Sequence, residues 1–258
     1  MLILLPPSEG KTRPADGPVL DPGMLRFPEL TDARKLTLSA LMEASSSAQA
    51  HQILGVGATL AGEVARNAVL ESEPCAPAHQ VYSGVLYDAL GYDSLTASQR
   101  RAADERVLVM SALWGAIGFS DPIPAYRLSM GTNLPGIGRL AAFWKTAQTE
   151  PLNDYAAGNL VVDCRSSTYA AAWRPDPAMT AAVNVFQIRG GERKVVSHFA
   201  KHTRGELARH LLTRSGPAPA TAAELRGAAA EKWDTELIPA SGTKPHQLNL
   251  ILPESTSR

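Results

Sequence analysis

Short apolar runs, each followed by a polar loop, are the main pattern along this chain. The clearest runs are residues 2–5 (LILL), 107–110 (VLVM) and 160–163 (LVVD). Runs of this length are typical of strands buried on both faces of a sheet. Residues 183–188 alternate instead and predict a half-buried strand, which a Gly190-Gly191 turn joins to a partner strand at 194–198. A last strand is predicted at 248–252.

Apolar residues at helical spacing lie between these strands. They predict helices over about 30–44, from the glycine turn at 55–57 to about 70, and over 84–90, 98–105, 139–148, 201–213 and 221–230. Alternating strands and helices favour an α/β fold, with α+β organisation as the alternative. We expect residues 1–258 to form a single domain with a central mixed sheet, surrounding helices and a helical hairpin at about 30–71.

Composition narrows the class of protein. Lys and Arg number 25, as do Asp and Glu, so binding to nucleic acid or anionic lipid would need a local basic patch. The two cysteines, Cys75 and Cys164, are far apart, which fits a reducing compartment and argues against disulfides or a zinc finger. No apolar run is of membrane-spanning length. We expect a cytoplasmic monomer without membrane contact, cofactor or bound metal.

The loop after the first strand, PPSEGK at residues 6–11, carries candidate chemistry. Ligands usually bind where strands of an α/β sheet end. Ser8, Glu9 and Lys11 offer a hydroxyl, a carboxylate and an ammonium, which are suited to holding a phosphate or carboxylate and moving a proton. The spacing is not that of a Walker loop, and the further motifs of serine–lysine acylases are absent. A turn with surface charge is the alternative.

A second polar loop follows the strand at 160–163. Asp163 and Arg165 either pair with each other, as a cap on the strand end, or face a ligand. Ser166 and Tyr169 add neutral hydrogen-bonding groups. The repeated combination of a buried strand and a polar loop predicts that distant segments build one pocket.

A third junction, at 196–205, is dense in cations. Lys201 and Arg204 are three residues apart and share a helix face beside His198. Cations near a helix N-terminus oppose the helix dipole, so this arrangement indicates an anionic partner, with a solvated basic face as the alternative. Arg127, after a proline-fixed turn, and Tyr82, beside a flexible turn, are further candidates.

The sequence LGVG at 54–57 is a different kind of signal. In helix-hairpin-helix modules, such a turn lets backbone amides bind a DNA phosphate without regard to base sequence. Gly55 and Gly57 would form this turn. Few cations flank it, and Glu63 and Glu71 weaken the local field, so a plain tight connection between helices is an equal alternative.

Taken together, these blocks resemble the YaaA family of bacterial peroxide-stress proteins over nearly the whole chain. The matching blocks are LILLPPSEGK at 2–11, VYSG at 81–84, SALWG at 111–115, YRLSMG at 126–131, FW at 143–144, DCRSSTY at 163–169 and SHFAKHTRG at 197–205. The resemblance implies a YaaA-type α/β fold, protection from peroxide by limiting iron-dependent oxidative damage, and a basic cleft that binds DNA. Lys11, Arg127, Lys201 and Arg204 would supply the cleft cations.

Two functions therefore remain open. One is a non-catalytic stress protein that binds double-stranded DNA through the basic cleft and the hairpin. The other is an enzyme acting on a small phosphorylated or carboxylated substrate, such as a nucleotide, in a pocket built from the loops at 6–11, 163–169 and 198–204. Ser8 would then be the nucleophile or a hydrogen-bond donor, Glu9 or Asp163 the base or a metal ligand, and Lys11 and Arg204 would hold the anion. Direct iron binding is disfavoured, because no HxxH, ExxH or cysteine cluster is present.

Overall fold

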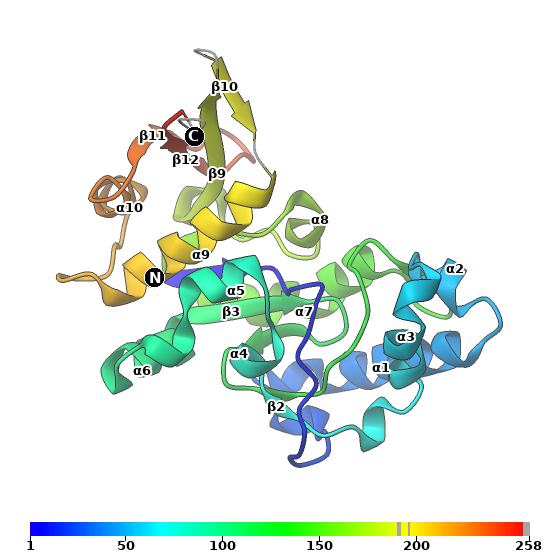
Figure 1. Cartoon of the computed structure of the whole chain (residues 1–258). Coiled ribbons are helices and arrows are strands. Elements are labelled where there is room, and N and C mark those ends of the chain that lie inside the picture. Colours follow the sequence, from blue (N-terminus) through cyan, green and yellow to red (C-terminus); the bar gives the residue numbers. More distant parts are fainter. Residues whose placement is uncertain (190–191, 196, 255–258) are drawn as a thin grey trace.

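The computed structural model describes residues 1–189, 192–195 and 197–254 (Figure 1). The predicted Gly190-Gly191 turn lies outside these ranges. A single large sheet organises the described chain. Its strands are β1 (Leu2–Leu5), β3 (Val107–Ser111), β4 (Gly115–Gly118), β8 (Val161–Asp163), β9 (Thr180–Arg189), β10 (Glu192–Val195), β11 (Asp234–Ile238) and β12 (His246–Leu252).

The sheet is mixed but mostly parallel in its centre. The order is β11-β12-β9-β8-β1-β3-β4, and β10 pairs with β9 outside this path. The pairs β12–β9, β9–β8, β8–β1 and β1–β3 are parallel, whereas β11–β12, β10–β9 and β3–β4 are antiparallel. The sequence-based prediction of an α/β fold with a central mixed sheet is confirmed.

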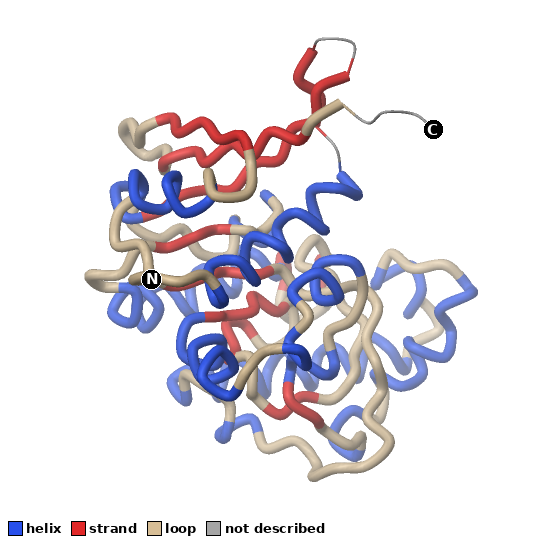
Figure 2. Tube along the Cα trace, turned by 60° about the vertical axis from the view of Figure 1, so that its left-hand side comes forward, coloured by secondary structure: helices blue, strands red, loops and turns tan. Residues whose placement is uncertain are grey.

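Helices lie on both sides of this sheet (Figure 2). They are α1 (Thr31–Ser46), α2 (Ala50–Leu54), α3 (Ala61–Asn67), α4 (Ala78–Val81), α5 (Val85–Leu90), α6 (Ala97–Arg106), α7 (Leu140–Ala156), α8 (Ser167–Ala170), α9 (Ser197–Thr213) and α10 (Ala222–Ala229). Two small ladders pair β2 (Ala76–Pro77) with β5 (Pro122–Ile123), and β6 (Asn133–Leu134) with β7 (Gly138–Arg139). No helix in the described ranges combines the length and apolar character needed to cross a membrane.

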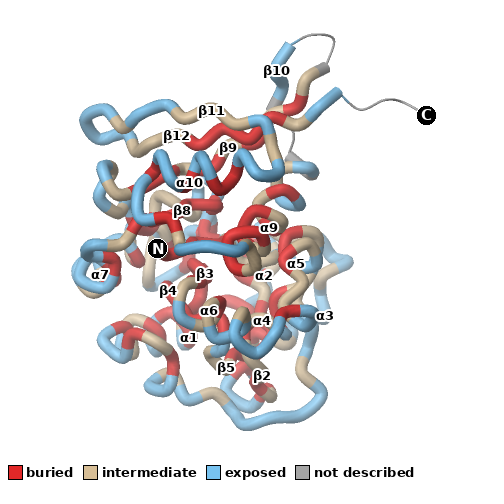
Figure 3. Tube along the Cα trace, turned by 90° about the vertical axis from the view of Figure 1, so that its left-hand side faces the viewer, coloured by how far each residue is buried: buried red, intermediate tan, exposed pale blue. Residues whose placement is uncertain are grey.

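The central strand β1 is buried on both faces, as its unbroken apolar sequence predicts. Ile3 and Leu5 belong to the larger hydrophobic cluster, which also holds Val107 and Val109 of β3. Leu2 and Leu4 belong to a second cluster on the opposite face. Figure 3 shows buried residues concentrated along the strands in the middle of the molecule. The loop after β1 therefore starts from a fixed point in the core.

Some local predictions need correction. The helix expected from 55–57 to about 70 is broken into the 3-10 turn η3 (Ala58–Leu60), α3 and a second 3-10 turn, η4 (Leu70–Ser72). The strand predicted at 194–198 gives way to α9 at Ser197, four residues before the predicted helix start. Lys201 therefore lies in the second turn of α9. Because the dipole acts mainly on the first turn, the argument that it opposes Lys201 does not apply.

Candidate functional site

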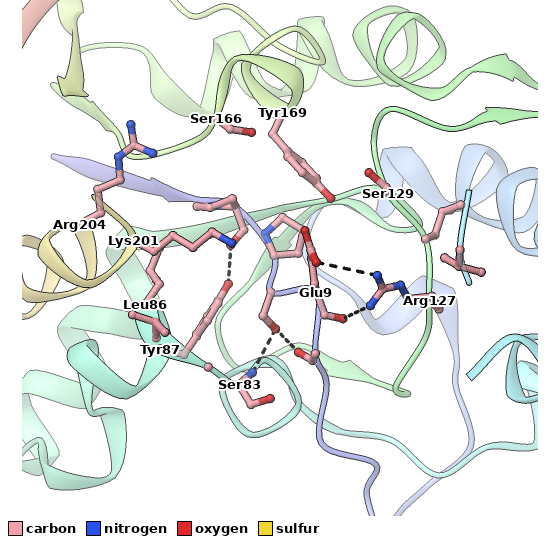
Figure 4. A pocket seen from close by; sticks show the side chains of 18 of the residues that line it. Glu9, Ser83, Leu86, Tyr87, Arg127, Ser129, Ser166, Tyr169, Lys201 and Arg204 are labelled. Atoms are coloured by element: carbon pink, nitrogen blue, oxygen red, sulfur yellow. Dashed lines mark hydrogen bonds and ion pairs between the residues drawn. The ribbon is translucent and has the colours of Figure 1, made fainter. Parts of the chain in front are cut away.

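A cleft of about 560 Å³ opens at the carboxyl end of β1 (Figure 4). Six segments line it: the loop after β1, the turn between α2 and α3, the start of α5, the stretch after Tyr126, the start of α8, and α9. The lining residues are Pro6, Pro7, Ser8, Glu9, Gly10, Leu54, Gly55, Val56, Ser83, Gly84, Val85, Leu86, Tyr87, Arg127, Leu128, Ser129, Ser166, Tyr169, Lys201 and Arg204. Segments far apart in sequence thus meet at one site.

The loop after β1 is fixed by its own polar groups. The Ser8 hydroxyl donates to the Gly10 carbonyl (2.5 Å) and accepts from the Ser83 amide (3.1 Å). The Lys11 ammonium donates to the Ser8 carbonyl (2.8 Å). Neither partner of the Ser8 hydroxyl is a base that could remove its proton. In this arrangement Ser8 shapes the loop, and its use as a nucleophile would require these bonds to break.

Lys11 does not line the cleft but lies beneath its wall. Its Nζ atom is 4.3 Å from the centre of the Tyr126 ring and 5.6 Å from that of Tyr82. Burial, with a smaller effect of the Arg127 charge, lowers the pKa of Lys11 to about 7, while Glu63 and Glu9 act in the opposite direction. The amine is therefore balanced between its charged and neutral forms near neutral pH.

Tyr82 packs beneath this half-buried amine. Its hydroxyl is 3.0 Å from the Tyr126 hydroxyl, which lies 2.7 Å from Ser111 Oγ. The side chain is almost fully buried, and burial raises the pKa of Tyr82 well above its usual value. Tyr82 is absent from the cleft lining, so its structural contribution is to the tyrosine layer beneath Lys11.

Helix α9 supplies a wall of uncompensated positive charge. Lys201 and Arg204 both line the cleft, and within the described part of the chain neither forms an ion pair with a carboxylate. Arg204 Nη2 donates to the Val183 carbonyl (2.8 Å), and its buried Nε has no protein partner there. A close approach of α9 to α5 brings this wall to the cleft: a Cβ on Gly205 would lie 2.1 Å from the Leu86 carbonyl oxygen.

The opposite wall carries Arg127, whose positive charge lies near two carboxylates. Its guanidinium lies 3.9 Å from the Glu9 carboxylate and 3.7 Å from that of Glu63, and it donates to the Glu9 carbonyl (3.3 Å), as Figure 4 shows in part. The Glu9 side chain is 81% exposed. The cleft is therefore polarised, with an unpaired cationic wall on α9 and a largely neutralised wall at Arg127.

Neutral hydroxyl groups lie between the two walls. Ser166 and Tyr169 were predicted and do line the cleft, near the start of α8. The Tyr169 hydroxyl accepts from the Met130 amide (3.4 Å). Ser83 and Ser129 were missing from the predicted site. Each is next to or near a predicted residue, but nothing in the sequence indicated which way its side chain would face.

Asp163 and Arg165 satisfy each other and do not line the cleft. Two hydrogen bonds join the guanidinium to the carboxylate, at 2.7 and 2.8 Å, and Arg165 also donates to the Trp173 carbonyl (2.9 Å). Both residues are buried. Of the two alternatives that the sequence left open, the structure shows the first: Asp163 and Arg165 pair with each other as a cap on the strand end. A role for Asp163 as a base facing the cleft has no geometric support.

The hairpin at 54–57 contributes one wall. Gly55, with a φ of 65°, ends α2 and lines the cleft together with Leu54 and Val56. Gly57 lies outside the lining and precedes η3. The side chain of His198 lies outside the described part of the structure. Across the described ranges, no group of three His, Cys, Asp or Glu side chains is arranged to hold a metal ion.

Comparison with known proteins shows which family this chain is similar to. Residues 1–236 match the model of a family described as peroxide stress protein YaaA. A UPF0246 protein of Streptomyces coelicolor is 44% identical over 98% of this chain and 99% of its own length. A UPF0246 protein of Corynebacterium efficiens is 46% identical over 86% of this chain and 89% of its own, and one of Methylibium petroleiphilum is 31% identical over 85% and 88%.

Proposed function

Because this chain belongs to the YaaA family of peroxide-stress proteins, we propose that it serves the peroxide-stress response by binding a small phosphorylated or carboxylated molecule in its cleft. The ligand's anionic group contacts Lys201 and Arg204. Glu9 is the carboxylate on the cleft wall, so any proton transfer on the bound molecule would use it.

The unpaired cationic wall of α9 carries this proposal. Arg204 is half-buried without a carboxylate partner in the described chain, and the exposed Lys201 lies one helical turn away, so an anionic group in the cleft would meet two cations. The buried Nε of Arg204 points the same way, since a buried donor without an acceptor costs about 1–3 kcal/mol. The adjacent hydroxyls of Ser83 and Ser166 add donors that suit phosphate or carboxylate oxygens.

The size of the cleft supports a small ligand. Its volume of about 560 Å³ falls within the usual range of small-molecule sites, about 300–1,000 Å³. Apolar groups such as Leu54, Val85 and Leu128 line part of it, so a ligand with an uncharged body fits better than inorganic phosphate alone.

Binding of DNA is a second candidate, favoured by one observation. Gly55 and Val56 of the glycine hairpin line the same cleft as Lys201, so a phosphate of a DNA backbone could be held between them. The balance of charge over the whole chain weighs against it, because non-specific DNA binding depends on many cations. In either case, the consequence that we propose in the cell is less iron-dependent oxidative damage.

Calorimetry at low salt with ribose 5-phosphate, and separately with a short DNA duplex, tests both candidates. We expect ribose 5-phosphate to bind, and the double variant Lys201→Ala, Arg204→Ala to bind it at least about tenfold more weakly. The control Lys145→Ala, Arg101→Ala removes the same charge from two exposed positions outside the cleft and should bind normally.

Three outcomes decide the matter. Wild-type affinity in the Lys201, Arg204 variant would overturn the α9 wall as the binding site. Binding of the duplex but not of ribose 5-phosphate, with a steep loss of affinity as salt rises, would favour the DNA candidate. Binding of neither probe would overturn both.

A further inference from the structure

We propose that the cleft continues into a second recess that holds a planar ring bearing amino groups, so that the ligand is a nucleoside monophosphate with an amino-substituted base. This inference rests on the proposed function, because the phosphate would occupy the cationic wall of the cleft. Adenine, guanine and cytosine carry such amino groups, and uracil does not.

The second recess adjoins the first and shares two lining residues with it. It measures about 270 Å³, and Ser83 and Tyr87 line both cavities. Tyr87 lies in α5 and Ser83 just before it, so the two cavities meet at the start of this helix. On the side of α5 that faces α9, Leu86 lies beside Lys201 (Figure 4). In the proposed binding mode, a ligand that contacts Lys201 and Arg204 extends past Ser83 into the recess.

Aromatic rings form much of the recess. His79 and Tyr92 stack with their ring centres 3.8 Å apart, and Phe119 meets Tyr92 edge to face at 5.4 Å. Tyr82 and Tyr87 also line it, but they are buried, as is Phe119, so His79 and Tyr92 offer the accessible ring surface. Faces and edges of aromatic rings are the surfaces on which nucleobases pack, with a gain of about 1–3 kcal/mol for each stacked base.

Two carboxylates line the recess, and two guanidinium groups, those of Arg100 and Arg209, lie at its rim. Asp88 and Asp93 line it, are exposed, and make no ion pair within the described ranges. Carboxylates accept hydrogen bonds from N–H groups, which amino-substituted bases provide. His79 adds a buried Nδ1 without a partner there. Burial lowers the pKa of His79 below its usual value, which disfavours the charged form of the ring.

Helix α9 holds both cavities in place. Four residues beyond Gly205, Arg209 extends its Nη1 to the Leu90 carbonyl (2.8 Å), the Gly91 carbonyl (3.0 Å) and Ser94 Oγ (2.8 Å). The rim of the recess is thus fixed by the same helix that carries Lys201 and Arg204. The two cavities form one preorganised site, and preorganisation lowers the entropic cost of binding.

The volume of the recess favours a nucleobase over a small ammonium compound. An ammonium compound would also suit carboxylates and aromatic rings. It would leave most of the recess empty, however, since about 270 Å³ is far more than a single ammonium group needs. A planar base fills this space and presents its amino group to Asp88 or Asp93.

The test is calorimetry on the intact protein with AMP, GMP, CMP, UMP and ribose 5-phosphate. We expect at least one of AMP, GMP and CMP to bind about tenfold or more tightly than UMP and ribose 5-phosphate, because an exocyclic amino group places two donors at the edge of the base, whereas uracil has only its ring N3–H and ribose 5-phosphate has no base. In the double variant Asp88→Asn, Asp93→Asn this preference should fall to about twofold, while affinity for ribose 5-phosphate stays unchanged.

Asp154→Asn is the matched control, since Asp154 is exposed on α7 and lines neither cavity. Equal binding of all four nucleotides and ribose 5-phosphate would overturn the recess proposal and leave the cleft proposal standing. A preference that survives in the Asp88, Asp93 variant would also overturn it. Failure of every probe, ribose 5-phosphate included, would overturn both.

Discussion

Arg127 and Arg204 carry the same charge and line the same cleft, yet their surroundings differ. Arg127 lies near two carboxylates, those of Glu9 and Glu63, whereas Arg204 donates to a backbone carbonyl and keeps a buried nitrogen without a partner in the described chain. The sequence predicted both arginines as anion-binding residues. It could not rank them, because Glu63 is distant in sequence and its approach to Arg127 depends on the fold.

The lowered pKa of Lys11 leads to a testable prediction. We expect its amine to titrate near pH 7, well below the usual 10.5, because burial disfavours the charged form. Reductive ¹³C-methylation followed by an NMR titration will measure this, since each dimethylated lysine gives its own signal. The signal that Lys11→Arg removes should be the one that titrates near neutral pH.

The same pKa has a consequence for stability. Between about pH 7 and 10.5 the unfolded chain keeps a proton on Lys11 that the folded protein has lost. The free energy of unfolding should therefore rise with pH across this window, relative to Lys11→Met. Urea unfolding of both proteins at pH 7 and pH 9 measures the difference. An identical change in the two proteins would contradict the lowered pKa.

At the scale of elements, the strands that the sequence predicted best are those buried on both faces. β1, β3 and β8 each read as an apolar run, because both sides of the strand need apolar side chains. β4 was missed, since its sequence GAIG resembles a turn. Its glycines are required by packing: a Cβ on Gly115 would lie 2.7 Å from the Trp144 ring. The need for glycine becomes apparent only in the folded protein, where Trp144 packs against Gly115.

The approach of α9 to α5 makes Gly205 a critical position. We expect Gly205→Ala to destabilise the protein by about 1–3 kcal/mol, because the added methyl group would overlap the Leu86 carbonyl. It should also weaken binding of ribose 5-phosphate, since α9 must shift away from the cleft. Urea unfolding and calorimetry are the measurements.

Gly227 provides the matched control for this substitution. It also lies inside a helix, α10, but a Cβ there would have no atom within 4 Å. Gly227→Ala should therefore stabilise the protein by about 0.5–1 kcal/mol through helix propensity alone. If both variants behave alike, close packing at Gly205 is not the cause.

At the scale of the whole molecule, the sequence predicted that distant loops would converge, and the structure brings together most of them. Ser8, Glu9, Gly55, Arg127, Ser166, Tyr169, Lys201 and Arg204 all line one cleft. Lys11, Tyr82, Asp163 and Arg165 lie behind it. Side chains beneath a site and side chains facing it have the same composition, so the sequence could not separate them. Whether such a side chain faces the cleft depends on how the chain folds around it.

The cellular prediction belongs to this scale as well. A strain that lacks the protein should survive hydrogen peroxide less well, and the wild-type gene should restore survival. The gene with Lys201→Ala and Arg204→Ala should not restore it, although the variant accumulates normally. Addition of a cell-permeant iron chelator should remove the difference between the strains. Full rescue by the variant would separate the cleft from the stress response.

The position of β1 in the centre of the sheet has a consequence for how the chain folds during synthesis. Leu2–Leu5 is synthesised before its two neighbours, β3 and β8, which begin at residues 107 and 161. At about 5–20 residues per second, β8 emerges on the order of ten seconds or more after β1. β3 emerges earlier, about 5–20 seconds after β1, and until then this apolar strand has neither of its neighbours. Its two proline residues, Pro6 and Pro7, follow at once and interrupt the exposed run. β1 is thus flanked on both sides only once β8 has been made.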